Sequence, residues 1–416
     1  MCYDNFAQMK RYRWSEHYYG GATKNMNIVR LLSLTHHLCL SLTLLGSIVF
    51  TSALKAESGY EQISTVALPE KPSPHWVWVN DASFDRIEAG RAALVDGDTG
   101  KYLGALTTGV FFMTLALPSD YHSIYSLETY YSRGVRGERT DIVRIYDPSS
   151  LQPVDEIAVP TKRGVGAPTL YHTSLTEDDR FLLIYNYTPS QSISVVDLKN
   201  KNFVGEIETP GCVLAYPDGP RTFHSLCGDG SVLKVELNNS GGLKRKSRLN
   251  NFFDPDSDPI QEDAVRVGDQ WLYVSYGSRI YPLSLKNSQL QGQAPWSLLS
   301  PEDKAQSWRC GGLQLIAVHE AMGRLYVLMH QGDEHSQELA GTEVWVYDLY
   351  KKERIQRIKL RIPAISIQLS RDLQPLLFAS AGGPELDIYD AMEGKHLRTA
   401  NNVSAFSTVL QVPWKQ

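Results

Sequence analysis

A repeated pair of short strands runs through most of the chain and limits the folds that it can adopt. In each copy, a run of β-branched and aromatic residues ends at an acidic or small polar turn, and a second such run follows. Seven copies occur, with turns at Asp96, Asp147, Asp197, Glu236, Ser284, Asp348 and Asp390. Two further strand-like runs precede most copies, so each unit holds about four short strands in roughly 40 to 50 residues.

Units of this kind predict an all-β fold, a seven-bladed β-propeller over residues 75–416. One unit alone cannot bury both faces of its sheet, whereas a closed ring of units can. The 22 Tyr, 31 Gly and 21 Pro residues agree with a fold rich in strands and turns. Helical periodicity is almost absent. The one short helix that we expect begins after Ser300, a suitable cap, with Pro301 in its first turn.

The first 56 residues are interpreted as an N-terminal extension followed by a secretory signal peptide. Residues 31–54 contain no charged side chain, Lys24 and Arg30 precede them, and small residues stand near their end. This order predicts export with cleavage, and either Met1 or Met26 can be the start. A membrane anchor is the alternative, because about 20 apolar residues span a bilayer. Residues 57–74 are polar and contain proline, which predicts an extended arm before the propeller.

The charge balance and the missing motifs argue against several classes of function. The formal charge is −5, and a nucleic-acid binder needs a clustered basic surface, so we expect no nucleic-acid partner. The chain has neither a phosphate-binding glycine motif nor the nucleophile elbow of a hydrolase. The His319-Glu320 pair lacks a second histidine, and residues 254–258 lack the glycine and glutamate that complete a calcium loop. We therefore expect neither metal ligands nor catalytic residues on this chain.

Three cysteines remain after the predicted presequence. Cys212 and Cys227 flank a turn-rich segment, and two strands joined by the turn at residues 217–220 would bring them within the Cα separation of a disulfide. In an oxidising compartment we predict that bridge, and the alternative is two buried free thiols. Cys310 would then be unpaired, and a buried free thiol fits it better than a redox role.

Seven segments of the chain carry a recognisable pattern: VWVNDASF (77–84), GVRGERTD (134–141), GC (211–212), CGDG (227–230), APWSLL (294–299), EDKA (302–305) and GRLYV (323–327). With these segments the chain resembles the large, or heavy, subunit of the quinoprotein amine dehydrogenases. The resemblance covers about residues 75–412, and the stretch at 294–299 is the most specific. The family includes methylamine dehydrogenase and aromatic amine dehydrogenase, and the chain looks closer to the aromatic enzyme. Cys310 is a departure, since the family usually carries proline there.

The resemblance implies a periplasmic assembly of two large and two small subunits. The small subunit would carry tryptophan tryptophylquinone, made from two of its own Trp residues, and the catalytic base. This chain would then hold no cofactor of its own. The assembly would oxidise a primary amine, aromatic ones by preference, to an aldehyde and ammonia. It would pass electrons singly to a small blue copper protein that resembles azurin or amicyanin.

Phe84 matches the channel phenylalanine of this family, which meets the quinone pocket from the large-subunit side. Without the resemblance, Phe84 would be an ordinary aromatic of a core or a hairpin.

A second class of function also stays open, namely a stand-alone periplasmic propeller that acts as a binding scaffold or a lactonase-like hydrolase. A hydrolase would need carboxylates that converge on a metal in the central channel, and the strand starts supply no such set. A small, Cys-rich, Trp-containing subunit that co-purifies would favour the first class.

Overall fold

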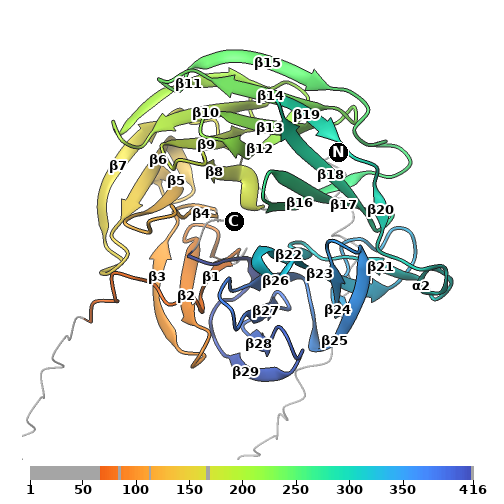
Figure 1. Cartoon of the computed structure of the whole chain (residues 1–416). Helices are drawn as coiled ribbons and strands as arrows, with labels where there is room; N and C mark the ends of the chain where they lie inside the picture. Colours follow the sequence, from red (N-terminus) through yellow and green to blue (C-terminus); the bar gives the residue numbers. More distant parts are fainter. Residues whose placement is uncertain (1–65, 83–85, 112–113, 165–168, 414–416) are drawn as a thin grey trace, which may run out of the picture. The chain divides into compact units, whose positions relative to one another are not determined.

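The repeats form seven antiparallel sheets arranged in a ring, so the predicted seven-bladed propeller is confirmed (Figure 1). The computed structural model describes residues 66–82, 86–111, 114–164 and 169–413. The predicted extension and signal peptide, residues 1–56, lie outside the described residues. Among the residues described, no helix combines the length and the apolar character that crossing a bilayer requires.

The seven sheets are numbered here as blades in chain order. Blade 1 is made of β30 (Ser407–Gln411), β1 (Trp76–Asp81), β2 (Arg91–Asp96) and β3 (Tyr102–Thr107). Blade 2 is made of β4 (Leu115–Ala116), β5 (Ile124–Arg133), β6 (Arg136–Tyr146) and β7 (Pro153–Val159). Blade 3 is made of β8 (Thr173–Leu175), β9 (Phe181–Asn186), β10 (Ser192–Asp197) and β11 (Asn202–Glu208). Blade 4 is made of β12 (Cys212–Gly219), β13 (Thr222–Cys227), β14 (Val232–Leu237) and β15 (Leu243–Leu249).

The last three blades follow the same plan with small additions. Blade 5 is made of β16 (Ile260–Val267), β17 (Gln270–Ser275), β18 (Arg279–Lys286), β19 (Gln289–Gly292) and the short β20 (Trp296–Ser297). Blade 6 is made of β21 (Trp308–Cys310), β22 (Ile316–His319), β23 (Arg324–Gln331), β24 (Gly341–Asp348) and β25 (Glu353–Ala364). Blade 7 is made of β26 (Ser366–Leu369), β27 (Leu376–Ser380), β28 (Leu386–Asp390) and β29 (His396–Ala400).

One short α-helix occurs among the described residues, where the sequence predicts it. Helix α2 (Pro301–Ala305) begins after Ser300, whose side-chain oxygen accepts a hydrogen bond from the Asp303 amide at 3.2 Å. Pro301 takes the first helical position, which needs no amide donor. Two single 3₁₀ turns, η3 (Leu170–His172) and η4 (Glu320–Met322), are the other short helical segments described.

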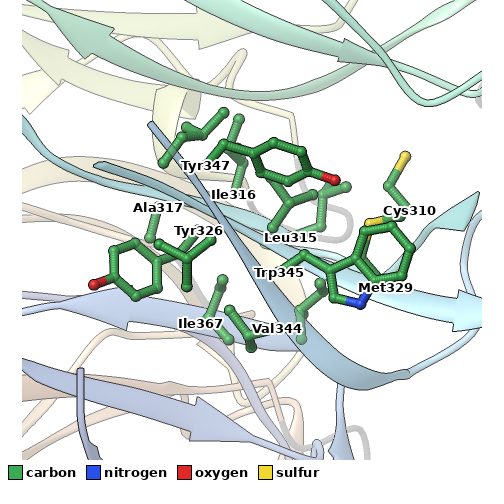
Figure 2. Close-up of a cluster of buried hydrophobic side chains, with 14 of the residues drawn as sticks. Cys310, Leu315, Ile316, Ala317, Tyr326, Met329, Val344, Trp345, Tyr347 and Ile367 are labelled. Atoms are coloured by element: carbon green, nitrogen blue, oxygen red, sulfur yellow. The ribbon is translucent and has the colours of Figure 1, made fainter. Parts of the chain in front are cut away.

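The middle strands are apolar on both sides because each blade packs between two others. Strands β1, β9 and β10 are buried at every residue, whereas the outer strand β25 keeps many exposed side chains. In Figure 1, β4, β8, β16 and β26 lie toward the centre of the ring, and β7, β11, β15 and β29 lie at its rim. A large cluster of buried side chains, centred on Trp345 and Tyr347 of β24, joins blade 6 to blades 5 and 7 (Figure 2).

The ring closes in blade 1, where the last strand pairs with the first. Strand β30 pairs antiparallel with β1, so blade 1 contains both ends of the propeller sequence. The side-chain amide of Gln411 then bonds both backbone polar groups of Leu115 in blade 2, at 2.9 and 2.8 Å. Gln314 bonds both polar groups of Leu410 in the same way, at 2.9 and 2.8 Å. These two amides connect β30 to blades 2 and 6, with which it shares no ladder.

His75 connects blades 1 and 7 at a second place. Its Nδ1 atom lies 2.6 Å from Oδ1 of Asp98, in the β2–β3 turn. Its Nε2 atom lies 3.1 Å from Oδ2 of Asp372, in the β26–β27 turn, but without hydrogen-bond alignment. The second contact is therefore an electrostatic one. A protonated imidazole between two carboxylates stabilises this seam.

The stability that His75 adds is expected to fall at alkaline pH. Burial lowers the pKa of His75, but the hydrogen bond to Asp98 and the charges of Asp372 and Asp98 outweigh it, so the pKa lies above 6.5. The contribution is therefore complete below about pH 6.5 and disappears as the pH rises through the native pKa. The loss of unfolding free energy in His75→Gln, from urea titrations, should be larger at about pH 6 than at about pH 9. Equal losses at both pH values would contradict this account.

Candidate functional site

The connections between strands divide the ring into two faces. Neighbouring strands within a blade run in opposite directions. The second and the fourth strands therefore end at the same face of the ring, so the connection from the second to the third strand and the link to the next blade both lie on that face. We call this the loop face, and we call the opposite one the turn face. In blade 1 the loop face carries the β1–β2 connection, residues 82–90, and the link from β3 to β4, residues 108–114. The predicted channel residue Phe84 belongs to the first of these connections, and residues 83–85 lie outside the described residues.

The carboxylate of Asp81 anchors both ends of the connection that contains Phe84. Its side chain is 2% exposed, and its Oδ2 atom accepts from Arg86 at 3.2 Å and from Arg91 at 3.1 Å. The same carboxylate accepts from the backbone amides of Ala405 and Phe406, both at 2.9 Å. Asp81 therefore fixes the start of the connection, its return, and the segment before β30. The sequence gives one signal for this role, an aspartate at the end of an otherwise apolar strand.

A second loop-face segment is hydrogen-bonded to the first. The Gly90 and Thr108 amides donate to the Gly109 and Gly90 carbonyls at 2.8 Å, and the Phe111 amide donates to the Ile87 carbonyl at 2.7 Å. Gly109 has φ +70°, and a Cβ there would lie 2.8 Å from the Thr129 carbonyl oxygen, so only glycine suits the position. Our sequence reasoning missed this neighbour of the Phe84 connection. The aromatic run at residues 111–112, which follows a predicted strand and Gly109, is the signal that could have shown it.

The buried carboxylate at the base of this site is fully engaged. The buried carboxylate of Asp81 already accepts from four donors, so it does not serve as a free general base. We call the two hydrogen-bonded segments, residues 82–90 and 108–111, the wall.

The turn-face end of the central channel holds a cavity of about 120 Å³. Tyr171 and Trp271 line one side, and Glu177, Asp179 and Arg266 stand at its opening. The polar groups are already engaged: Arg266 pairs with Glu177 at 3.3 Å, and Asp179 accepts from the Ser119 amide at 2.8 Å. Within the described ranges no three His, Cys, Asp or Glu side chains stand close enough to hold a metal ion. The converging carboxylates that a lactonase-like hydrolase would need are thus not found in the part of the chain that the structure describes.

The cysteines are arranged as the sequence indicates. Cys212 and Cys227 lie directly opposite each other on β12 and β13, and they form a disulfide with Cα atoms 3.9 Å apart. Cys310 is a free, buried cysteine in the cluster of Figure 2. Burial raises the pKa of its thiol to about 11, so the reactive thiolate is scarce at neutral pH.

Comparisons with solved structures agree on the fold. A protein of unknown function from Desulfotomaculum acetoxidans matches with a TM-score of 0.54 and 14% identity, over 81% of this chain and 98% of its own. A protein titled a putative 6-phosphogluconolactonase from Bacteroides fragilis matches with a TM-score of 0.55 and 11% identity, over 82% and 99%. At these identities the likeness concerns the fold alone. Together with the ring of seven sheets, it places the chain in the class of β-propellers.

Sequence comparisons identify the family. The family model described as methylamine dehydrogenase heavy chain matches residues 74–412. The heavy chain of methylamine dehydrogenase from Paracoccus versutus is 32% identical over 340 residues, which is 80% of this chain and 79% of the relative. That from Methylophilus methylotrophus is 28% identical over 312 residues, or 74% of this chain and 76% of the relative. The chain belongs to the methylamine dehydrogenase heavy chain family, and is thus an oxidoreductase subunit.

Proposed function

We propose that this chain is the large subunit of a periplasmic amine dehydrogenase that oxidises primary amines, with a preference for aromatic ones. Two large and two small subunits would form the enzyme, and the large one would be a scaffold and a wall of the substrate channel. The observation that carries the proposal is the family match over residues 74–412. The loop-face wall around the Phe84 connection supports it, because Asp81 anchors the connection at both ends and its own carboxylate is already engaged.

The reaction fixes what the other chain must supply. One primary ammonium ion and one water give an aldehyde, an ammonium ion, two protons and two electrons. Tryptophan tryptophylquinone on the small subunit would take up the two electrons, and a blue copper protein that resembles azurin or amicyanin would accept them one at a time. On this chain Trp308 and Trp345, with ring centroids 5.0 Å apart, are 6% and 0% exposed and belong to the buried cluster of blade 6. Arg357 covers both rings.

The isolated chain is expected to lack both activity and colour. Expressed alone with its export segment, it should show no amine oxidation and no quinone absorbance. Expressed together with a small, Cys-rich, Trp-containing subunit, it should yield a complex with both properties. The measurements are dye-linked amine oxidation and the visible spectrum of the purified protein. Turnover or a quinone spectrum from this chain alone would refute the subunit assignment.

Phe84→Ala is expected to change which amines the complex prefers. A phenylalanine has no titratable group, so it contributes only packing, shape and exclusion of water. A lost apolar contact of this size discriminates between substrates by roughly 1–3 kcal/mol. The ratio of kcat/KM for a bulky aromatic amine to that for a short alkyl amine should therefore shift about tenfold. The quinone spectrum and the transfer of electrons to the acceptor should stay unchanged. An equal fall for both amines, or no change for either, would make Phe84 a packing residue.

A further inference from the structure

One element of blade 2 extends beyond the sheet on the loop face. Strands β5 and β6 have 10 and 11 residues, and they pair from Ile124 opposite Tyr146 to Arg133 opposite Arg136. The third strand of this ladder, β7, ends with Val159 opposite Asp141. Residues 130–140 therefore form a two-stranded ribbon, which we call the arm. Two-stranded ribbons are only marginally stable in water without a further surface to pack on.

The arm is exposed, and its edges are open. Nearly all of its residues are exposed, including Tyr130 at 39% and Val135 at 46%. Among the described residues, no backbone group of the arm bonds to any residue outside the hairpin. Arg133 and Arg136 stand on either side of the tip, and Glu138 is the acidic residue nearest to them. The tip thus offers an apolar side chain between two cations, next to unpaired strand edges of the kind that another chain can extend.

Buried charges fix the root of the arm. The carboxylate of Asp141, 1% exposed as a residue, accepts from Arg139 Nε at 2.8 Å, from Arg139 Nη2 at 2.6 Å and from the Thr129 hydroxyl at 2.7 Å. Arg163, 2% exposed, donates to the Thr129 hydroxyl at 2.5 Å and to the Val110 carbonyl at 2.9 Å. Burying the charged groups of Asp141 and Arg163 costs free energy that apolar side chains would not cost. The network they form fixes the direction in which the arm projects.

The root of the arm is continuous with the wall around Phe84. The Val110 amide donates to the Thr129 carbonyl at 2.8 Å, and the next residue, Phe111, bonds to Ile87. Arg163 holds the same Val110 through its carbonyl group. The arm, residues 108–111 and the Phe84 connection therefore form one hydrogen-bonded unit on the loop face. A molecule held against the wall lies beside the arm.

We propose that the arm is a docking element that grips the small subunit, an inference that rests on the proposed function. The arm reaches past the wall along the flank of the docked subunit. The matching surface of that subunit carries an apolar site flanked by acidic or carbonyl groups for Arg133 and Arg136. The buried network at Asp141 and Arg163 sets the angle at which the arm projects, so the subunit docks in a single orientation over the wall.

The test uses the complete complex, made by co-expression with the small subunit. In one variant an Asn-Gly turn replaces residues 132–138. The two-residue turn connects Tyr131 to Arg139, its partner in the ladder, and leaves the buried network intact. A second variant carries Val135→Asp and Arg136→Glu at the exposed tip. The control is Leu373→Asp, an 81% exposed residue on the turn face. The readouts are the dissociation constant of the small subunit, the activity per assembled complex and the melting temperature of the large subunit.

Both arm variants should bind the small subunit at least tenfold more weakly, with the activity per complex and the melting temperature kept and the control unaffected. Binding as tight as that of the wild type in both variants would overturn the proposal. Loss of large–large association with small-subunit affinity unchanged would also overturn it, because the occupant would then be a second copy of this chain. If the wild-type chain itself binds no small subunit, the proposed function fails, and the arm proposal fails with it. This result differs from tight binding by both arm variants, which overturns the arm proposal alone.

Discussion

A chain that ends at Phe406 is expected to lose the cooperative unfolding of the propeller. The truncation removes β30, and with it the pairing that closes blade 1. Val409, Leu410 and Val412 are each at most 4% exposed. Burying a side chain of this size contributes about 1.5–3 kcal/mol, so the three together contribute about 5–9 kcal/mol. That amount is comparable with the about 5–15 kcal/mol that stabilises a typical domain.

The measurement is urea unfolding followed by tryptophan fluorescence, together with the elution volume in size exclusion. The truncated chain should elute as an expanded or aggregated species without a sharp transition. A chain that ends at Pro413 keeps all of β30 and serves as the control, which should unfold like the full-length protein. A sharp transition at the wild-type midpoint in the chain that ends at Phe406 would show that closure through β30 is dispensable.

Replacing Asp81 by alanine is expected to destabilise the protein and to disturb docking. The change leaves Arg86 and Arg91 without their shared carboxylate and leaves two backbone amides without an acceptor. Both arginines are partly exposed, so water compensates for some of the loss, and we expect about 2–4 kcal/mol in unfolding free energy. Asp81→Asn keeps the size of the side chain and one acceptor oxygen, so its unfolding free energy should lie between those of the wild type and Asp81→Ala. Urea titrations of the three proteins provide the measurement.

An exposed ion pair supplies the control for Asp81. Asp155 pairs with Lys201 at 2.5 Å, but both side chains are largely in water, so Asp155→Ala should change stability little. In the complex, Asp81→Ala should also weaken small-subunit binding, because the Phe84 connection loses its anchor. Equal stability of the Asp81 and Asp155 variants would mean that the buried carboxylate has no special role.

The parts of the fold that the sequence predicted are local in the chain. Each strand–turn–strand copy lies within about 15 residues, so alternation and turn residues reveal it without knowledge of distant contacts. The Ser300 cap of α2 and the pairing of Cys212 with Cys227 are local in the same sense. Seven such copies then suffice to predict a ring of seven blades.

The parts that the sequence did not predict depend on residues far apart. Asp81 bonds Ala405 and Phe406 across more than 300 positions, and no periodic pattern marks such a contact. The arm was missed for another reason. Its residues form an ordinary hairpin, and only the early end of β7 shows that they project without a third strand. The role of Phe84 rests on resemblance, and it stays a prediction.

The closure of the ring through β30 has a consequence for the order in which the molecule matures. Blades 2 to 7 are each built from consecutive strands, so each can form as soon as its own segment is free to fold. Blade 1 must wait for the last residues, and so must Asp81, because Ala405 and Phe406 are among them. The wall around Phe84 is therefore the last region to acquire its final shape. A partner that binds at this wall would therefore bind a chain whose ring is closed in preference to one that is still folding.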